Sequence, residues 1–239
     1  MGILISLDEK KEYTLCPAGR KIGILYQIID LGTQKFEYKG KTKFNRKIMI
    51  YFELPFETKK FREDEEKKPF IISKKFTLSL NEKSNLSKFL NDWCDGQFIK
   101  KFKSQIENGK FDITRLIGAG GLLYIQHNEY NEKKYASISN IMPLEKLEKE
   151  QLVLEENSKN KYQTVNEKKF FSLDGFNKGN FDLEEFEKLP EWIKEEISKS
   201  KEYDVLFKKF PEAIGLSENY IDENLNEEDT ILNKDEIPF

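Results

Sequence analysis

The sequence has few of the residues on which metal and redox sites depend. Its 239 residues include one histidine, His127, and two cysteines, Cys16 and Cys94, which stand far apart along the chain. Metal sites and Cys–His catalytic pairs need more ligands or partners than these. We therefore expect no metal, no cofactor and no enzymatic activity. Two reduced thiols would fit a reducing compartment.

Long apolar runs are also missing. No stretch approaches the ~18 consecutive apolar residues that a membrane-spanning helix requires. Residues 1–7 are short and lead directly into the charged stretch 8–11, which does not fit a secretory leader. We expect a cytoplasmic protein that has no membrane partner.

The sequence also lacks a phosphate-binding loop. The stretch "GAGG" at 118–121 has no Lys-Ser or Lys-Thr after it, and it leads into a strand where a helix would be needed. We interpret it as a turn. The abundant carboxylates lie in runs with lysine, a pattern typical of solvated surfaces.

What the chain does contain is charge and aromatic side chains, with 35% charged residues, 19 Phe and 10 Tyr. The net charge of −3 conceals a division. Residues 216–239 hold one base and eight acids, a formal charge of −7, so residues 1–215 carry +4. A basic body can attract a polyanion that the tail would repel.

Three strands are predicted first. Residues 21–31 form an apolar run that stops at Gly32, and residues 45–55 and 70–80 alternate between apolar and polar positions. In the second run, Ile48, Ile50, Phe52 and Leu54 share one face, which leaves the positions between them for the other face.

The period then changes to that of a helix over 82–93, with Asn81 as the expected N-cap. A short helical piece follows at 112–117, and two strands after Gly121 surround a turn at 130–132. Three strands, a helix and two strands is the order of an OB-fold, a five-stranded, partly open barrel. Other small barrels share this order, so the topology alone leaves the fold open.

We therefore expect a mainly β protein with added α structure. Its divisions would be an OB-like single-stranded-DNA-binding domain at 1–143, a linker at 144–180, a helical segment at 181–215 and a disordered acidic tail at 216–239. Within the helical segment, Asp182 suits an N-cap and Pro190 suits the start of a second section.

The sequence ends in "DEIPF". This closely resembles the C-terminal motif of bacterial and phage single-stranded DNA-binding proteins, an acidic run closed by Ile or Leu, Pro and Phe. In that family the tip binds replication, recombination and repair enzymes. The resemblance implies the same role for a tip formed by Asp235, Glu236, Ile237, Pro238 and Phe239.

The body is similar to a group of phage and prophage proteins in three stretches: "DLGTQ" at 30–34, "ISKKFTLSL" at 72–80 and "LPEWI" at 189–193. This second resemblance favours a phage-type origin.

Basic and aromatic residues gather on the strand face and loops that an OB-fold uses for ligands. Non-specific single-strand binders use cations for phosphates and rings for bases. The candidate DNA-binding residues are Phe36, Tyr38, Lys39, Lys41, Lys43, Phe44, Lys47, Tyr51, Lys75, Tyr130, Lys133 and Lys134.

The sequence thus predicts a protein that coats single-stranded DNA and recruits enzymes through its tip. One alternative is a decoy that occupies an enzyme's tip-binding pocket without binding DNA. Another is a strand-annealing recombination protein. Self-association into a homo-oligomer is left open.

Overall fold

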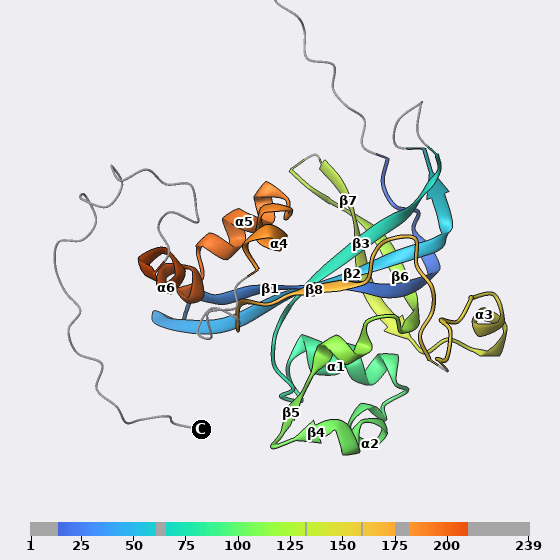
Figure 1. Cartoon of the computed structure of the whole chain (residues 1–239), viewed down its shortest axis with the longest axis horizontal. Coiled ribbons are helices and arrows are strands. Elements are labelled where there is room, and N and C mark those ends of the chain that lie inside the picture. Colours follow the sequence, from blue (N-terminus) through green and yellow to red (C-terminus); the bar gives the residue numbers. More distant parts are fainter. Residues whose placement is uncertain (1–13, 61–65, 132, 159, 175–181, 210–239) are drawn as a thin grey trace, which may run out of the picture.

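The computed structural model describes residues 14–60, 66–131, 133–158, 160–174 and 182–209 (Figure 1). The predicted acidic tail and its tip, Asp235, Glu236, Ile237, Pro238 and Phe239, lie outside the described residues.

The centre of the molecule is an antiparallel sheet of five strands: β1 (Gly19–Tyr38), β2 (Lys41–Lys59), β3 (Lys68–Thr77), β6 (Gly120–Tyr130) and β7 (Lys133–Met142). Their order is β3-β2-β1-β6-β7. A sixth strand, β8 (Lys169–Phe171), runs parallel to β1 at Gln27–Ile29. The predicted mainly β architecture with added helices is confirmed.

The sheet does not close into a barrel. β3 and β7 are its end strands, and no backbone ladder joins them within the described residues. Lys74 bridges this seam by donating from Nζ to the carbonyl of Ile138. A cavity of about 630 Å³ opens beside it, lined by residues 68–73 of β3, Ala136 of β7, Asn166 and residues 14–16. The OB-fold-like five-stranded barrel expected from the sequence is therefore not confirmed.

The first face of the sheet carries the main core. Ile48, Ile50, Phe52 and Leu54 of β2 are buried there, as their alternation predicts. Helix α1 (Asn85–Trp93) packs against this face, and the ring centroids of Phe52 and Trp93 lie 5.6 Å apart.

The start of α1 differs from the prediction. The helix begins at Asn85, where the side chain of Ser84 accepts a hydrogen bond from the backbone of Ser87. Asn81 instead accepts from the backbone of Lys83 in the preceding turn. Ser and Asn are both good N-caps, and the tertiary position of the apolar face selects between them.

A small excursion follows α1 below the sheet (Figure 1). It comprises α2 (Phe98–Lys101), η1 (Lys103–Gln105), the two-residue strands β4 (Ile106–Glu107) and β5 (Lys110–Phe111), and η2 (Ile113–Leu116). The rings of Phe98, Phe102 and Phe111 lie 5.1 Å from one another and hold it together.

The range predicted as a linker packs against the sheet over its described residues. It contains α3 (Lys146–Glu150) and β8, and it buries Leu144, Tyr162, Phe171 and Leu173. Glu53 of β2, 1% exposed, holds this segment by accepting hydrogen bonds from the backbone of Val165 and Asn166.

The predicted helical segment forms α4 (Leu183–Glu187), α5 (Glu191–Ser198) and α6 (Lys201–Lys209), with Asp182 as the N-cap and Pro190 directly before α5. These helices cover the second face of the sheet (Figure 1). Phe186, Leu189, Ile193 and Ile197 are buried there against Ile29, Leu31 and Met49. No helix in the described ranges has the length and apolar character to span a membrane.

Candidate nucleic-acid interface

The β1–β2 hairpin brings together seven of the twelve predicted DNA-binding residues. Its strands pair from Gly32↔Lys47 to Tyr38↔Lys41 and are joined by Lys39 and Gly40, both at positive φ of 52° and 71°. A two-residue turn of this kind matches the twist of its strands. The hairpin presents Phe36, Tyr38, Lys39, Lys41, Lys43, Phe44 and Lys47.

Cations and rings alternate along this hairpin. The ring of Tyr38, 52% exposed, has Lys43 Nζ at 4.9 Å and Lys39 Nζ at 5.4 Å from its centroid. Lys47 Nζ lies 5.9 Å from the Phe36 ring. Cross-strand partners share a face, so Phe36, Tyr38, Lys41 and Lys43 point to the same side. This side offers the exposed ring of Tyr38 for stacking, the half-buried ring of Phe36 beside it, and ammonium groups for phosphates.

The hairpin is also electropositive. Residues 35–44 hold four lysines and one glutamate. All four lysines are exposed, so their charges face solvent. Because the whole chain is acidic, this local excess of cations is the opposite of the overall balance.

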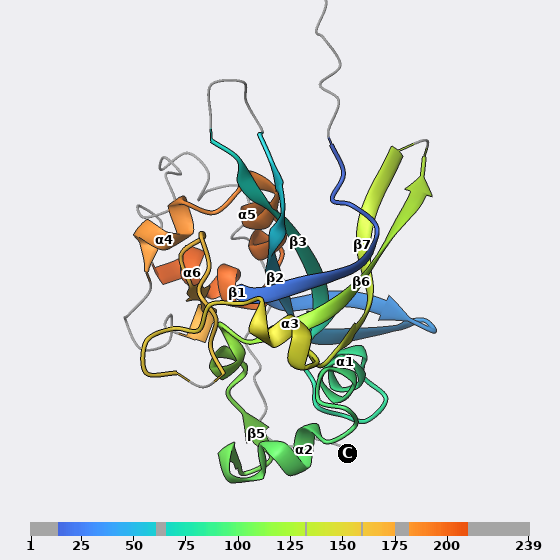
Figure 2. The same cartoon turned by 90° about the vertical axis from the view of Figure 1, so that its right-hand side faces the viewer.

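The β6–β7 hairpin holds the predicted residues Tyr130, Lys133 and Lys134 on a second projection. Tyr130 is 69% exposed and pairs with Lys133 across the strands. In Figure 1 the β1–β2 hairpin extends to the left and the β6–β7 hairpin extends upward, so they form separate projections, which Figure 2 shows from the side. The second hairpin is less basic, because Glu129 pairs with Lys134 across the strands.

The remaining predicted residues lie on or beside the face of the sheet that the C-terminal helices cover. Tyr51 packs against the cluster formed by α4 and α5, and its hydroxyl is buried without a hydrogen-bond partner among the described residues. Burial raises the pKa of Tyr51 to about 12. Lys75 forms an ion pair with Glu196 of α5 at 2.5 Å, and Lys47 donates to the hydroxyl of Thr77 at 2.6 Å.

Tyr51 and Lys47 lie on the strand face that the alternation predicts, but helices cover this face and it is not open to solvent. Both alternate with the core residues of β2, and parity alone assigns such positions to solvent. The face is occupied by helices that are about 140 residues away in sequence. Tyr51 is therefore a packing residue, and Lys75 is an ion-pair partner of α5.

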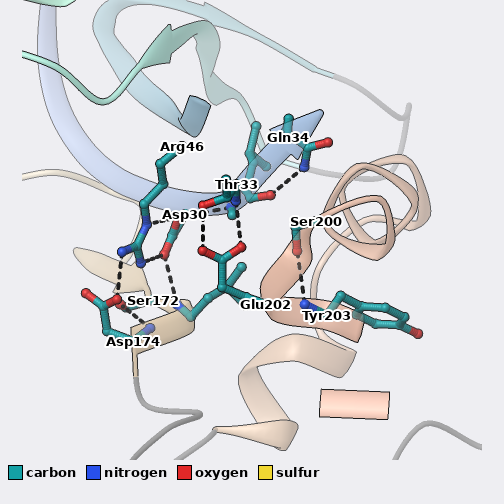
Figure 3. A network of polar contacts seen from close by, with 12 residues as sticks. Asp30, Thr33, Gln34, Arg46, Ser172, Asp174, Ser200, Glu202 and Tyr203 are labelled. Atoms are coloured by element: carbon teal, nitrogen blue, oxygen red, sulfur yellow. Dashed lines mark hydrogen bonds and ion pairs between the residues drawn. The ribbon is translucent and has the colours of Figure 1, made fainter. Parts of the chain in front are cut away.

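The "DLGTQ" stretch at the end of β1 anchors those helices (Figure 3). Asp30 accepts from Arg46 Nε at 3.1 Å and from the backbone of Leu173 at 3.0 Å. Thr33 donates to Glu202 of α6 from both its backbone, at 2.6 Å, and its hydroxyl, at 2.7 Å. Gln34 donates to the carbonyl of Glu196 at 2.8 Å.

The ionic state of this network follows from its contacts. Hydrogen bonding to Asp30, opposed by burial, raises the pKa of Arg46, and Arg46 also pairs with Asp174 at 2.7 Å. Burial raises the pKa of Glu202, but the hydrogen bonds from Thr33 outweigh it, so the pKa is lowered overall. Both groups are held in their charged forms.

Gly32 permits the close approach of the α5–α6 junction to β1. It has a φ of +74°, and a Cβ built on it would lie 2.4 Å from the Cβ of Ser200. Ser200 is fully buried, and its backbone forms an isolated antiparallel β-bridge with that of Gln34. A side chain at residue 32 would therefore push the helices away from the strand.

Sequence reasoning missed three residues of the candidate interface. Lys35 and Tyr135 are exposed on the two hairpins, and hairpin position alone would have included them. Lys201 of α6 places Nζ 3.4 Å from the centroid of the Phe44 ring. Nothing local to residue 201 indicates this contact, which depends on the docking of α6.

Comparison with known proteins gives no assignment: the chain matches no protein-family model and no curated protein.

Proposed function

We propose that this chain is a non-sequence-specific single-stranded DNA-binding protein that acts in DNA replication, recombination and repair. The observation that supports this function best is the exposed cluster of tyrosine and lysines on the β1–β2 hairpin. Exposed rings surrounded by ammonium groups suit the two parts of a nucleotide, the base and the phosphate.

The sheet order supports an OB-like origin for this site. In an OB-fold, ligands lie across strands two and three and between the loops that join strands one to two and four to five. With the short strands left out, these loops correspond to the β1–β2 and β6–β7 hairpins. We infer an opened OB-like barrel. Helices cover the strand face that binds ligands in an OB-fold, so in this chain the hairpins bind the ligand.

Binding would depend on stacking and on phosphate neutralisation. Base–aromatic stacking contributes about 1–3 kcal/mol per base, and each neutralised phosphate contributes about −0.7 to the slope of log affinity against log salt. Tyr38, Lys41 and Lys43 share one face of the hairpin and are its principal contacts.

The tip gives the protein its second proposed role. Ile237, Pro238 and Phe239 follow two carboxylates, so an apolar pocket with a basic rim on a partner enzyme would recognise them. In this proposal the body holds DNA and the tip recruits replication, recombination or repair enzymes.

A titration of fluorescently labelled oligo(dT) tests the DNA-binding role. The triple variant Tyr38→Ala, Lys41→Ala, Lys43→Ala should lose at least about tenfold in affinity, and its salt slope should fall by about 1.4 for two lost phosphate contacts. The matched control, Lys100→Ala with Lys103→Ala, removes the same charge from the excursion below the sheet.

Unchanged affinity in a folded triple variant would remove the hairpin from the interface. If the parent chain does not bind oligo(dT) at low salt but still captures repair enzymes, the decoy alternative replaces this proposal. Acceleration of pairing between complementary strands would favour the annealing alternative.

A further inference from the structure

A second cavity of about 530 Å³ lies below the sheet, between α1, α2 and the segment that carries α3 (Figures 1 and 2). Its volume is within the range of about 300–1,000 Å³ typical of small-ligand sites. None of the candidate DNA-binding residues lines it. A ligand in this cavity is therefore separate from a strand held at the hairpins.

The glycine-rich stretch 118–121 forms one wall of the cavity, through Ala119 and Gly120. A Cβ built on Gly120 would lie 2.7 Å from the side chain of Leu144 and 3.0 Å from the ring of Tyr162. Glycine at residue 120 lets both side chains pack directly against the backbone of β6. The stretch therefore sets the shape of this wall.

Four aromatic side chains contribute to the lining: Trp93, Phe98, Phe102 and Tyr162. The indole of Trp93, a residue that is 6% exposed, donates to the carbonyl of Gly120 at 2.8 Å, which fixes the ring in the wall. Phe102 is half-buried and is the more accessible ring. Lys101 Nζ lies 5.7 Å from its centroid, so a ring and a cation are adjacent. Planar bases pack against rings of this kind.

The charged residues of the lining are all basic. They are Lys101, Arg115, Lys149 and Lys161, and no acidic residue of the described chain joins them. The whole chain has 43 acids and 40 bases, so this arrangement is not a sample of the average composition. The cavity therefore attracts an anion.

Three of these cations are available to a ligand. Lys101, Arg115 and Lys149 are exposed, and none has an ion-pair partner among the residues that the structure describes. Lys161 is already engaged, since its Nζ donates to the carbonyls of Arg115 and Ile117. Ammonium and guanidinium groups form their strongest hydrogen bonds with carboxylate or phosphate oxygens.

Two amide side chains complete the lining, those of Gln105 and Asn160. Within the described ranges, neither side chain forms a hydrogen bond. An amide offers donors and an acceptor together, as the edge of a base does. A fatty acid would leave the amides unmatched, and an inorganic anion would leave the rings unused. Rings, amides and cations together match a base joined to a phosphate.

We propose that this cavity binds a nucleotide, a planar base that carries a 5′-phosphate. The base packs beside Phe102 and Trp93, and the phosphate lies at Lys101, Arg115 and Lys149. The nucleotide is either free in solution or the 5′ end of a strand, since both present the same chemistry. The site goes beyond the proposed function, because it is separate from the hairpins.

Energy transfer from Trp93 tests the site. The chain has two tryptophans, so Trp192→Phe leaves Trp93 as the single donor. This full-length protein is titrated with dATP that carries a 3′-methylanthraniloyl fluorophore, and the emission of the fluorophore is followed while the indole is excited. We expect a saturable rise that unlabelled dATP reverses.

Deoxyadenosine and inorganic triphosphate separate the two parts of the ligand. Each should require at least about tenfold higher concentrations than dATP to displace the probe, because each lacks either the charge-assisted bonds or the stacking. No saturable rise, or displacement by triphosphate as effective as that by dATP, would overturn the proposal.

Charge removal locates the site. Lys101→Ala with Arg115→Ala should weaken probe binding at least about tenfold, since two cations that bind phosphate are lost. The matched control, Lys100→Ala with Lys103→Ala, removes the same charge from the same excursion at residues that do not line the cavity, and it should leave probe binding unchanged. Equal losses in the two variants, with both folded by circular dichroism, would also overturn the proposal.

Competition by DNA distinguishes the two sources of the nucleotide. Displacement of the probe by 5′-phosphorylated oligo(dT), but not by its unphosphorylated counterpart, assigns the site to a strand end, and no displacement by either assigns it to a free nucleotide. Equal displacement by both would place the probe at the hairpins and overturn the proposal. Labelled oligo(dT) binding is measured on the same proteins, so failure of the probe to bind leaves the DNA-binding proposal intact.

Discussion

Two glycines with the same backbone conformation differ in what surrounds them, and this difference makes a matched test. Gly32 and Gly40 have φ values of +74° and +71°. A methyl group at Gly40 would meet nothing within 4 Å, whereas at Gly32 it would meet Ser200. Gly32 therefore has a steric role in addition to a conformational one.

We expect Gly40→Ala to lower the free energy of unfolding by about 1–2 kcal/mol, the cost of the left-handed conformation alone. Gly32→Ala should cost more, because the α5–α6 junction must also move. Thermal unfolding measures the first quantity, and limited proteolysis within α6 reports the release of the helices. Equal losses of stability in the two variants would mean that the packing of Ser200 against β1 does not require glycine at residue 32.

Cys16 gives the protein a pH dependence in alkaline solution. Burial, assisted by the nearby carboxylate of Glu57 and opposed by Lys21, raises the pKa of Cys16 to about 11. Its ordinary value is 9.0, so the unfolded thiol ionises first. The neutral buried thiol stabilises the fold fully below pH 9, and this contribution is lost as the pH rises from 9 towards 11.

The free energy of unfolding should therefore fall between pH 9 and pH 11, as measured by urea denaturation. Cys16→Ala should have a smaller slope over this range, although its absolute stability is lower. Cys94 retains part of the slope, because burial raises its pKa as well. A slope identical in the parent and Cys16→Ala would contradict the assignment.

At the scale of the element, α5 is held by one face. Ile193 is fully buried against the second face of the sheet, while its neighbour Trp192 is 48% exposed. Ile193→Ala should cost about 2–5 kcal/mol of stability, the usual range for such a cavity. Chemical denaturation gives the value.

Trp192→Phe on the same helix is the control and should change stability by less than about 0.5 kcal/mol. The Ile193→Ala variant should still bind oligo(dT), since the hairpin contacts lie elsewhere. Loss of DNA binding in a folded Ile193→Ala protein would show that the helices take part in the interface.

The elements that could be predicted from the sequence are those with a local signal. The period-two alternation of Ile48, Ile50 and Phe52 located β2, and the period of Leu86, Phe89, Leu90 and Trp93 located α1. Their ends were less certain, because caps and turns compete at close range. β8 could not be predicted, since three residues carry no period.

The candidate site divides in the same way. Its hairpin residues were within reach of sequence reasoning, because a turn between two strands exposes its tip. The sequence could not predict that helices cover Tyr51 and Lys75. This coverage depends on contacts between β1 or β3 and helices more than 100 residues later in the chain. Alternation identifies two faces of a strand but does not say what covers the second.

At the scale of the whole molecule, charge is divided between a body of +4 and a tail of −7. In the proposed function, this tail would repel phosphate and compete with it for the basic hairpin. Replacing Glu227, Glu228 and Asp229 by their amides leaves the tip intact and removes three of these charges. We expect tighter oligo(dT) binding at low salt, and a difference that fades as screening shortens the range of the charges.

Fluorescence anisotropy at about 20 mM and about 300 mM salt measures the gain in affinity and its loss on screening. These concentrations lie below and above 0.1 M, where the screening length is ~10 Å. Deleting residues 216–239 should produce a larger gain in the same direction. A gain that is equal at both salt concentrations would contradict an electrostatic origin.

The contact between Thr33 and Glu202 also sets an order of events on the ribosome. The two residues are 169 positions apart. At about 5–20 residues per second, β1 is made about 8 to 34 seconds before its partner in α6. During that time the nascent chain presents Leu31 and Met49 without their covering helices, so a chaperone that binds apolar strands has its opportunity before residue 202 emerges.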